Sequence, residues 1–589
     1  PEVLRVNPDG RRILFSQRHN HCYTSPVYRE KVQAMNRALA QRFGRHPAVI
    51  LWHLSNEYGG ECHCPLCQAA FREWLKKKYG TLEALNHAYW NSFWSHSYSD
   101  WEQISSPMEG IGEHSHHTLV LDWKRFVTDQ TVDFMRAEAA ALRQYSPDVP
   151  ITTNMMGFYD GLNYGKFRDV CDVISWDNYP HWHNGEEGEA ASVAMAHDLM
   201  RSLKPDRPFL MMESSPSATN WEPVAKLRRP GMHMLSSLQA VAHGSDSVQY
   251  FQWRKCRGGF EKFHGAVVGH DGTGSTRVFR DVQQVGERLG RLSQLCGARF
   301  PARAALLCDM ENRWILDQIK GLINSQPEKG FLGDLKAMYR PFFQNGVNVD
   351  VVDMEADLTP YQLVAAPMLY LLRAGIAGKL RRFVEEGGVL VGTYWSGVAD
   401  ENDLCFLGGA PGQGLDEVFG LRAEEIDALY PQDSNQVQLL PGKGLPGMKE
   451  SYQARELCEL VNLTTAQPLA VYGQDFYQGR PALTVNRFGK GRAYYICSRN
   501  SQDFLDDFLG ALIRELGLRA IDTELPAQVT VNVRENRETG RPYYFVQNFG
   551  GSPAQVKLPQ GFADLESGAP CPGVLELEPY SLRILTKAE

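Results

Sequence analysis

The first half of the chain alternates short apolar runs with segments whose apolar residues recur every three or four positions. Five such runs occur before about residue 300, at 48–54, 151–155, 173–176, 209–212 and 248–251. Continuous apolar runs flanked by helices are typical of strands in a parallel sheet that is buried on both faces. The periodic segments, such as 67–79 and 121–145, predict amphipathic helices. This alternation indicates the α/β class.

Polar side chains lie at the ends of these runs. They include Asn56, Glu57, Asn154, Asp177, Asn178, Glu213 and Gln252. Enzymes built on parallel sheets collect their catalytic groups at the carboxyl ends of the strands. A polar residue can simply mark the end of a strand, but its repetition at five run ends favours a shared active site.

The number of strands bears on the architecture. A (β/α)8 TIM barrel has eight parallel strands, and only five runs fit before the pattern changes near residue 300. We therefore interpret residues 1–300 as the fourth to eighth strands of a partial TIM barrel. On this interpretation, we expect the first three strands to lie upstream of Pro1.

Two further patterns follow. Between 301 and 520, buried runs such as 304–307 and 349–352 alternate with helices, which predicts a doubly wound α/β domain of the flavodoxin or amidotransferase type. The turn at 392–397 has no cysteine in a nucleophile position, so we expect an assembly role there. From 521 to 589, short alternating runs predict a small antiparallel β-sandwich.

Composition and charge narrow the choice of partners. The formal net charge is −8 at pH 7 and no basic run is present, which argues against binding to nucleic acid or an acidic membrane. No apolar stretch is long enough to cross a membrane. Eight of the twelve cysteines are scattered singly, as small core residues are in a reducing compartment. A neutral small-molecule substrate fits this composition best.

Two glutamates carry the strongest signals for chemistry. Glu57 lies in Trp52-His-Leu-Ser-Asn-Glu-Tyr-Gly59, where aromatic neighbours provide the partly apolar environment that raises the pKa of a general acid. Glu213 directly follows the run at 209–212. Glycosidic bond cleavage uses two carboxyl groups, and a pair about 5 Å apart leads to retention of configuration. Either residue alone could instead form a salt bridge at a strand end, but the pair favours catalysis.

Four cysteines are not scattered. Cys62-His-Cys-Pro-Leu-Cys67 has C-x-C-x-x-C spacing, and Cys22 lies upstream. Four thiolates suit a structural zinc ion with tetrahedral sulfur ligation. His63 is an alternative ligand, and free cysteines in a loop before a helix are the alternative without metal. The histidine-rich stretch 113–117 lies in a loop rich in glycine and serine, where we expect solvated side chains rather than a metal site.

Several motifs together resemble one known family. They are Arg18 with Cys22-Tyr-Thr-Ser-Pro-Val-Tyr28, Asn56-Glu-Tyr-Gly59, the C-x-C-x-x-C, Met212-Glu-Ser-Ser-Pro216 with Asn220-Trp221, and Tyr250-Phe-Gln-Trp-Arg254 with Glu261-Lys-Phe-His-Gly265. In this order and at this spacing they resemble the β-galactosidases of glycoside hydrolase family 42. The resemblance extends over the whole chain and is densest from 1 to 300.

The resemblance implies a retaining β-galactosidase that hydrolyses terminal β-D-galactosides by double displacement, with Glu57 as acid/base and Glu213 as nucleophile. The positions that match the galactose site are Arg18, Asn56, Asp177, Trp221, Phe251, Glu261 and His264. Glu261 and His264 are expected to contact the hydroxyls that distinguish galactose. The positions that match a structural zinc cluster are Cys22, Cys62, Cys64 and Cys67. The chemistry itself requires no cofactor.

The same resemblance implies a homotrimer formed through the 301–520 domain and a cytoplasmic location. Two alternatives remain open from the sequence. One is hydrolysis of α-L-arabinopyranosides, whose ring lacks the 6-hydroxymethyl group of galactose. The other is a non-catalytic carbohydrate-binding or assembly protein, which the presence of both glutamates disfavours.

Overall fold

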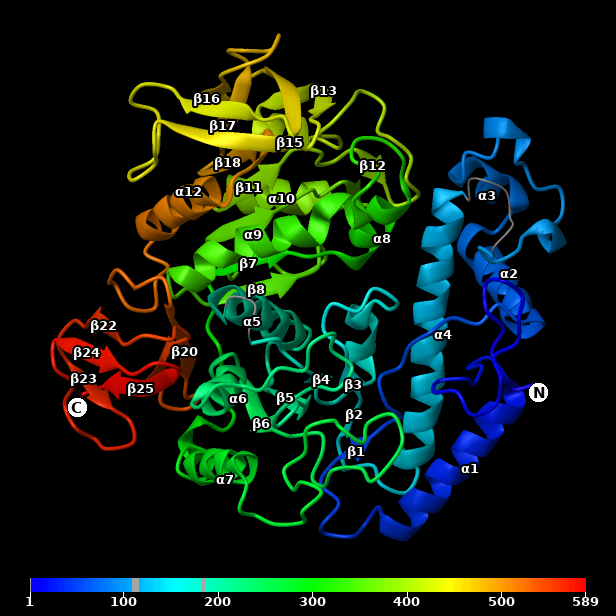
Figure 1. Cartoon of the computed structure of the whole chain (residues 1–589). Helices are drawn as coiled ribbons and strands as arrows, with labels where there is room; N and C mark the ends of the chain where they lie inside the picture. The colour runs from blue at the N-terminus through cyan, green and yellow to red at the C-terminus, as the bar shows by residue number, and fades with distance from the viewer. Residues whose placement is uncertain (1, 109–115, 183–185, 589) are drawn as a thin grey trace.

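The structure is a computed structural model that describes residues 2–108, 116–182 and 186–588 (Figure 1). Three regions follow one another along the chain. We call them the catalytic region (1–300), after the catalytic groups that the sequence predicts there, the middle domain (301–520) and the C-terminal domain (521–589). In Figure 1 the middle domain lies above the catalytic region, and the C-terminal domain lies beside α6. One continuous apolar core joins catalytic-region helices to the middle domain and to aromatic residues of the C-terminal domain.

The catalytic region contains a series of parallel strands. They are β1 (Trp52–His53), β2 (Ile151–Thr152), β3 (Asn154–Met155), β4 (Ser175–Asp177), β5 (Phe209–Glu213) and β6 (Ser245–Val248). β1 pairs with β2, and β3, β4, β5 and β6 pair in that order. Only Thr153 separates β2 from β3, so the strands follow one another as neighbours, as in a TIM barrel.

Helices surround these strands. They are α1 (Pro26–Phe43), α2 (Pro65–Tyr79), α3 (Leu82–Ala88), α4 (His117–Arg143), α5 (Glu186–Ser202), α6 (Met232–Ala242) and α7 (Arg277–Gly290). Short segments of 3-10 helix occur at η1 (Phe93–Ser95), η2 (Trp101–Gln103), η3 (Tyr164–Asp169), η4 (Ser293–Leu295) and, in the middle domain, η5 (Pro327–Gly330). The helices predicted at 67–79 and 121–145 correspond to α2 and α4.

One predicted strand was displaced. The apolar run 248–251 predicted a strand, whereas β6 covers Ser245–Val248 and ends where that run begins. The polar residues at 245–247 resemble a turn in the sequence. In the structure the Ser245 hydroxyl instead accepts a hydrogen bond from the backbone N–H of Met211 on β5, 3.0 Å away, so a polar segment pairs inside the sheet.

The middle domain contains the predicted doubly wound sheet. Its parallel strands are β7 (Ala304–Leu307), β8 (Val349–Val352), β9 (Leu363–Ala366), β11 (Val389–Thr393) and β18 (Gly491–Ile496). Their spatial order is β8-β7-β9-β11-β18, which is the flavodoxin-like order. Its helices are α8 (Met310–Gln318), α9 (Phe331–Gln344), α10 (Ile376–Glu385), α11 (Leu415–Phe419) and α12 (Gln502–Glu515).

An antiparallel extension of this sheet was not predicted. Its strands are β13 (Leu421–Ala428), β14 (Asn435–Leu439), β15 (Ser451–Leu463), β16 (Gln467–Tyr472) and β17 (Pro481–Phe488), with β19 (Ser498–Asn500) at its side. β17 joins it to the parallel part by pairing with β18. A separate short pair is β10 (Leu371–Leu372) with β12 (Ala399–Asp400).

The C-terminal domain is antiparallel, as the alternating pattern predicted. Its larger sheet contains β20 (Val529–Glu535), β21 (Pro542–Asn548), β25 (Ser581–Lys587) and β23 (Phe562–Asp564), in that order. The smaller sheet pairs β22 (Ala554–Lys557) with β24 (Val574–Leu577). Apolar residues from both sheets form one core between them.

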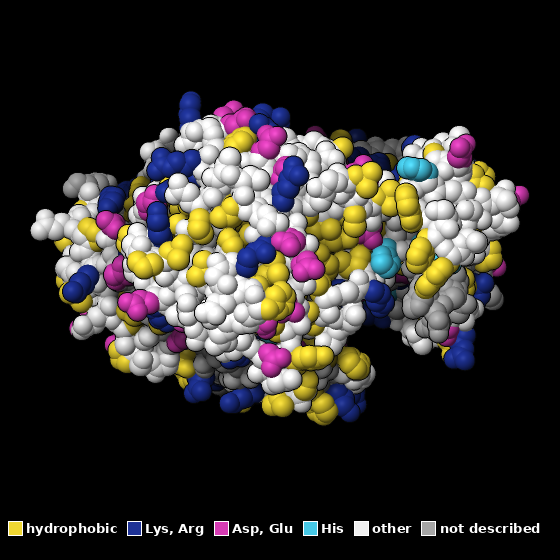
Figure 2. Space-filling model, turned by 90° about the horizontal axis from the view of Figure 1, so that it is seen from above, with side chains coloured by type: hydrophobic (Ala, Val, Ile, Leu, Met, Phe, Trp, Pro, Cys, Tyr) yellow, Lys and Arg dark blue, Asp and Glu magenta, His cyan; other side chains and the backbone are white. Residues whose placement is uncertain are grey.

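The surface bears charges of both signs. Figure 2 shows the molecule from the middle-domain end, where basic and acidic side chains are interspersed among apolar ones. Within the described ranges, no helix has the length and apolar character needed to span a membrane.

Candidate active site

Glu57 lies in a tight turn just beyond β1. Its φ is +42°, an uncommon value for a residue with a side chain. Its backbone N–H donates to Asn154 Oδ1 at 2.9 Å. Arg5 donates to the carbonyl of Gly59 at 2.6 Å, and Tyr58 donates to Glu138 in the core. The turn is therefore anchored by groups from several elements.

Three carboxyl groups meet beyond the strand ends. One oxygen each of Glu57, Asp177 and Glu213 lies within 4.8 Å of the other two. Asp177 ends β4 and pairs in register with Glu213 at the end of β5. Inverting glycosidases hold their carboxyl groups about 6.5–9.5 Å apart, so this closer group has the spacing of a retaining enzyme.

Asn154 connects the members of this group. Its Nδ2 donates to Asp177 Oδ2 at 2.6 Å, to Glu213 Oε1 at 3.2 Å and to Asn56 Oδ1 at 3.0 Å. Because its Oδ1 also accepts from the N–H of Glu57, a single amide at the start of β3 sets the relative positions of both glutamates.

Burial and mutual repulsion favour protonation of two of these acids. Burial, and then the negative charges of Glu213 and Glu57, raise the pKa of Asp177 to about 10. Burial also raises the pKa of Glu213, although the Tyr179 hydroxyl, which donates to Glu213 Oε2 at 2.6 Å, acts in the opposite direction. Asp177 is therefore neutral at pH 7, and Tyr179 favours the anion of Glu213.

An aromatic wall stands beside Glu213. The Trp221 ring stacks on His264 with centroids 4.7 Å apart and meets the Tyr179 ring edge-on at 5.0 Å. The Phe251 ring lies 5.4 Å from His264. Trp221 is 42% exposed, so the wall offers an apolar face to a ligand, as sugar rings prefer.

His264 does not face open space. It is buried, with Nδ1 3.1 Å from Asn220 Oδ1 and Nε2 3.1 Å from the carbonyl of Phe251. Both ring nitrogens therefore lie within hydrogen-bond distance of protein oxygens, and the ring stacks on Trp221. Glu261, which was expected to act with His264, is half-buried, and its negative charge contributes to the raised pKa of Glu213.

Arg18 and Asn56 both contact Glu57. Arg18 Nη2 donates to Glu57 Oε2 at 2.5 Å, although the arginine side chain is 66% exposed. Asn56 Nδ2 lies 3.4 Å from the same oxygen. The structure thus brings the sequence-predicted catalytic and sugar-binding residues together beyond the ends of β1, β4 and β5.

Two residues of this site received no role in the sequence analysis, although Asn154 was noted there as a polar residue at the end of a run. The Asn154 side chain accepts a hydrogen bond from the backbone N–H of Glu57 and donates one to Glu213 Oε1. The Tyr179 hydroxyl donates to Glu213 Oε2. Both lie at the ends of predicted strands, so the same signal that identified Asp177 was available for them. Their partners, however, become visible only once the strands are placed side by side.

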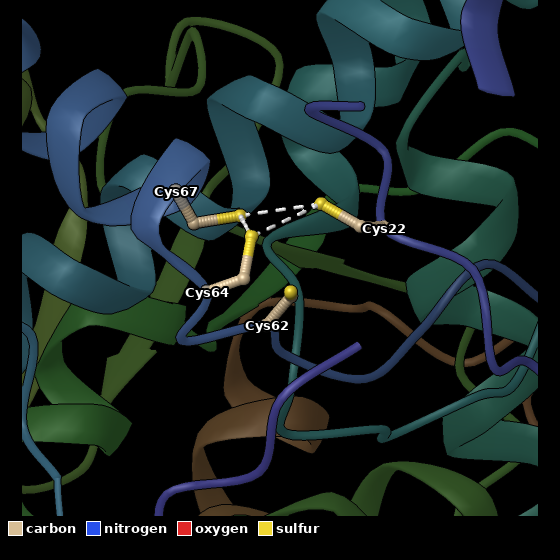
Figure 3. A group of neighbouring side chains, drawn as sticks. All are labelled: Cys22, Cys62, Cys64 and Cys67. Atoms are coloured by element: carbon tan, nitrogen blue, oxygen red, sulfur yellow. Dashed lines mark hydrogen bonds between the residues drawn. The ribbon is translucent and has the colours of Figure 1, made fainter. Parts of the chain in front are cut away.

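The four predicted cysteines converge in a second group (Figure 3). Cys22 comes from the N-terminal segment, and the others come from the residues that lead into and begin α2. All four sulfur atoms lie within 4.8 Å of one another. Cys22 Sγ is 3.7 Å from Cys64 Sγ and 3.5 Å from Cys67 Sγ, and the latter two are 3.8 Å apart.

These distances fit a bound metal ion. A tetrahedron with Zn–S bonds of about 2.3 Å has sulfur atoms about 3.8 Å apart. The buried cluster is therefore compatible with a structural metal. His63 is not part of it, because its Nδ1 lies 2.8 Å from Ser106 Oγ and its Nε2 lies 3.4 Å from Glu61.

The histidine-rich stretch 113–117 falls partly outside the described residues. Residues 113–115 are not described. His116 and His117 are half-buried rather than solvated, and His117 Nδ1 lies 3.0 Å from Asp403 of the middle domain.

Comparisons with known proteins agree along the whole chain. Residues 1–292 match a glycoside hydrolase family 42 model described as β-galactosidase. Residues 302–519 match a model described as β-galactosidase trimerisation domain, and 528–587 match one described as β-galactosidase C-terminal domain.

Relatives and solved structures show the same similarity. The chain is 56% identical to β-galactosidase BglY of Alicyclobacillus acidocaldarius, covering 100% of this chain and 85% of that protein. It is 45% identical to β-galactosidase GanA of Bacillus subtilis, covering 99% and 86% respectively. The crystal structure of a β-galactosidase from Rahnella sp. R3 superposes with a TM-score of 0.96 at 49% identity, covering 100% of this chain and 85% of that one.

Proposed function

The chain belongs to glycoside hydrolase family 42, and on this premise we propose that it hydrolyses terminal β-D-galactosides with retention of configuration. The observation that carries the proposal is the close approach of Glu57 and Glu213, with carboxyl oxygens within 4.8 Å of each other. The relatives that match over the whole chain are named β-galactosidases. Nothing specific favours the arabinopyranoside alternative.

In the first step, Glu57 acts as general acid and Glu213 as nucleophile. The Glu213 carboxylate attacks the anomeric carbon while Glu57 gives its proton to the departing glycosidic oxygen. The C–O bond to the leaving group breaks, and an ester bond forms between Glu213 and galactose. The hydrogen bond from Tyr179 to Glu213 favours the anion that this attack needs.

In the second step, Glu57 acts as general base. Its carboxylate takes a proton from water as the water oxygen attacks the anomeric carbon, and Glu213 leaves as a carboxylate. Two inversions give net retention. Asn56 lies beside Glu57, and we expect it to bond the 2-hydroxyl of the sugar, a contact that can strengthen in the transition state.

Azide rescue tests the roles of the two glutamates. Glu213→Ala removes the nucleophile, so we expect kcat/KM for an aryl β-D-galactoside to fall by at least about 10³-fold. Added azide should then restore turnover and give the α-galactosyl azide, because a single displacement inverts the anomeric centre. Glu57→Ala with azide should give the β-galactosyl azide. Undiminished activity of Glu213→Ala would show that another residue is the nucleophile.

We further propose that the four-cysteine group holds zinc. Zinc would fix Cys22 of the N-terminal segment against α2, a structural role that leaves the chemistry to the carboxyl groups. Metal analysis of the purified protein should give one zinc ion per chain. Cys64→Ser should lose it, and Cys296→Ser, at an exposed cysteine outside the group, should keep it. Another metal, or none, in the wild type would contradict the proposal.

Assembly as a homotrimer is the third part of the proposal. It is supported by the match of 302–519 to a trimerisation-domain model and by strongly exposed apolar side chains on the middle domain, Leu407, Tyr430 and Phe476. Light scattering should give three times the chain mass. A monomer at micromolar concentration would contradict this part of the proposal and leave the catalytic part intact.

A further inference from the structure

Helix α8 of the middle domain holds a loop of the catalytic region. Arg313 Nη1 donates to the carbonyl of Phe158 at 2.5 Å, and Trp314 Nε1 donates to the carbonyl of Asp160 at 2.6 Å. Both donors belong to buried side chains. Arg313 is itself held by Glu328, whose Oε1 lies 2.6 Å from the guanidinium. α8 also packs against α4 of the catalytic region (Figure 1), so both donors lie on a helix that is itself in contact with that region.

The residue between these two carbonyls contacts the Glu57 turn. The Tyr159 hydroxyl accepts a hydrogen bond from the backbone N–H of Gly60 at 3.1 Å. The same hydroxyl lies 2.9 Å from where a side chain on Gly59 would begin, and the Tyr159 ring lies 2.3 Å from that position at Gly161. The ring is therefore packed tightly between its own loop and the turn.

The turn requires support of this kind. Glu57 has φ at +42°, and such a backbone persists only where its surroundings hold it. Asn154 bonds the turn at Glu57 and Arg5 bonds it at Gly59, both from the catalytic region. The bond at Gly60 comes from Tyr159, whose flanking carbonyls are held by the middle domain.

We propose that Arg313 and Trp314 are positioning residues for the acid/base Glu57, acting through the Phe158–Asp160 loop and Tyr159. The middle domain then contributes to catalysis as well as to assembly. A carboxyl displaced by about 1 Å can lose roughly 10²-fold in rate, so the lost bonds should reduce proton transfer to the leaving group. This inference rests on the proposed role of Glu57.

The dependence of kcat/KM on the leaving group distinguishes this positioning role from a merely structural one. Cleavage of phenyl β-D-galactoside needs a proton on the departing oxygen, whereas dinitrophenolate leaves without one. For Trp314→Phe, Arg313→Met and Tyr159→Phe we expect kcat/KM for the phenyl substrate to fall about tenfold and that for the dinitrophenyl substrate by less than about twofold. Tyr159→Phe removes one oxygen atom only, so it remains informative if the α8 variants fold poorly.

Two reference variants complete the experiment. Glu57→Ala should show the same selective loss more strongly, with about 10³-fold for the phenyl substrate. Tyr339→Phe is the matched control, because Tyr339 donates across the same domain boundary to Asp198 at 2.5 Å, far along the chain from the Glu57 turn. It should lower the melting temperature without changing the ratio of the two rates.

The outcomes are distinguishable. If Glu57→Ala shows the selective loss and the Arg313, Trp314 and Tyr159 variants resemble Tyr339→Phe, the positioning role is wrong and the proposed function stands. If Glu57→Ala itself affects both substrates equally, Glu57 is not the acid, and both proposals fail. Selective loss in all three loop and α8 variants supports the inference.

Discussion

The molecule contains two parallel sheets whose strand ends both carry acidic side chains, but in opposite electrostatic settings. In the catalytic region, Asp177 and Glu213 end adjacent strands beside Glu57. Among the described residues, Arg18 is the one cationic side chain that bonds this group, and it is 66% exposed. In the middle domain, Asp309 and Glu311 follow β7 at the equivalent place.

The middle-domain acids are neutralised by fixed arginines. Arg373 bonds Asp309 at 2.7 Å, and Arg125 bonds Glu311 at 2.5 Å. Burial alone would raise the pKa of Glu311, but the charge and hydrogen bonds of Arg125, aided by Arg373, hold it at about 2. At the catalytic strand ends burial prevails, and the pKa of Asp177 rises to about 10.

The difference separates structural acids from catalytic ones. A carboxylate bound by buried guanidinium groups stays ionised, and the positive charge beside it makes it a weaker nucleophile and a weaker base. Carboxyl groups that are crowded together with little compensating charge are not held as bound anions, so their oxygens remain available to exchange protons and to attack. Equivalent positions in two α/β sheets thus serve different purposes, according to whether arginines are built in beside them.

The largest expected effect tests the structural half of this comparison. Arg125→Met leaves buried Glu311 and Asp122 short of a partner, so the free energy of unfolding should fall by about 3 kcal/mol. Urea denaturation measures it. Arg18→Met is the control, because exposed ion pairs contribute less than about 1 kcal/mol. Equal losses in the two variants would remove the distinction between the two sets of acids.

The next effect concerns Asp177. Because its raised pKa makes it neutral at pH 7, Asp177→Asn preserves both its charge state and an oxygen for Asn154, which donates to it at 2.6 Å. We expect kcat/KM at pH 7 to stay within about tenfold of wild type for Asp177→Asn and to fall about 10²-fold for Asp177→Ala. If the two variants were equally impaired, Asp177 would act as an anion, and crowding would not explain its role.

Local patterns predicted much of this fold. The runs at 304–307 and 349–352 are predicted as strands because they are apolar at every position except Asp350, and the structure buries both strands completely. The antiparallel strands β13 to β17 were not identified, because one or both of their faces meet solvent and their sequences are mixed, as in Asn435–Leu439. β6 begins earlier than predicted for the same reason, because its residues Ser245–Val248 are mostly polar.

The residues of the site likewise include some that local sequence patterns predict and others that only the packing of two domains reveals. Glu57 and Glu213 were predicted because a carboxyl group at the end of an apolar run is a local signal. The bond from Arg313 to Phe158 spans 155 positions, and no spacing in the sequence indicates it. Contacts of this kind depend on how two domains pack, so Tyr159, Arg313 and Trp314 became visible only in three dimensions.

The smallest expected effect is the contribution of Glu213, one of the catalytic acids, to the pH dependence of stability. Burial raises the pKa of Glu213 in the folded state above its ordinary value of 4.5. Its protonated form therefore contributes stability that is fully present below pH 4.5 and is lost as pH rises through the folded-state pKa. Glu213→Gln is neutral at every pH and should escape this loss.

Melting temperatures measured against pH make the contrast quantitative. Below pH 4.5 the melting temperature of Glu213→Gln should equal that of wild type. Near pH 8 it should be higher than that of wild type by on the order of 2 °C. Glu311→Gln should show the reverse, because the pKa of Glu311 is depressed: its stability is present above pH 4.5, so the variant should melt below wild type there. A Glu213→Gln variant that is less stable than wild type at pH 8 would mean that this carboxylate is held as firmly as Glu311. Its reactivity would then need a cause other than the shortage of positive charge around it.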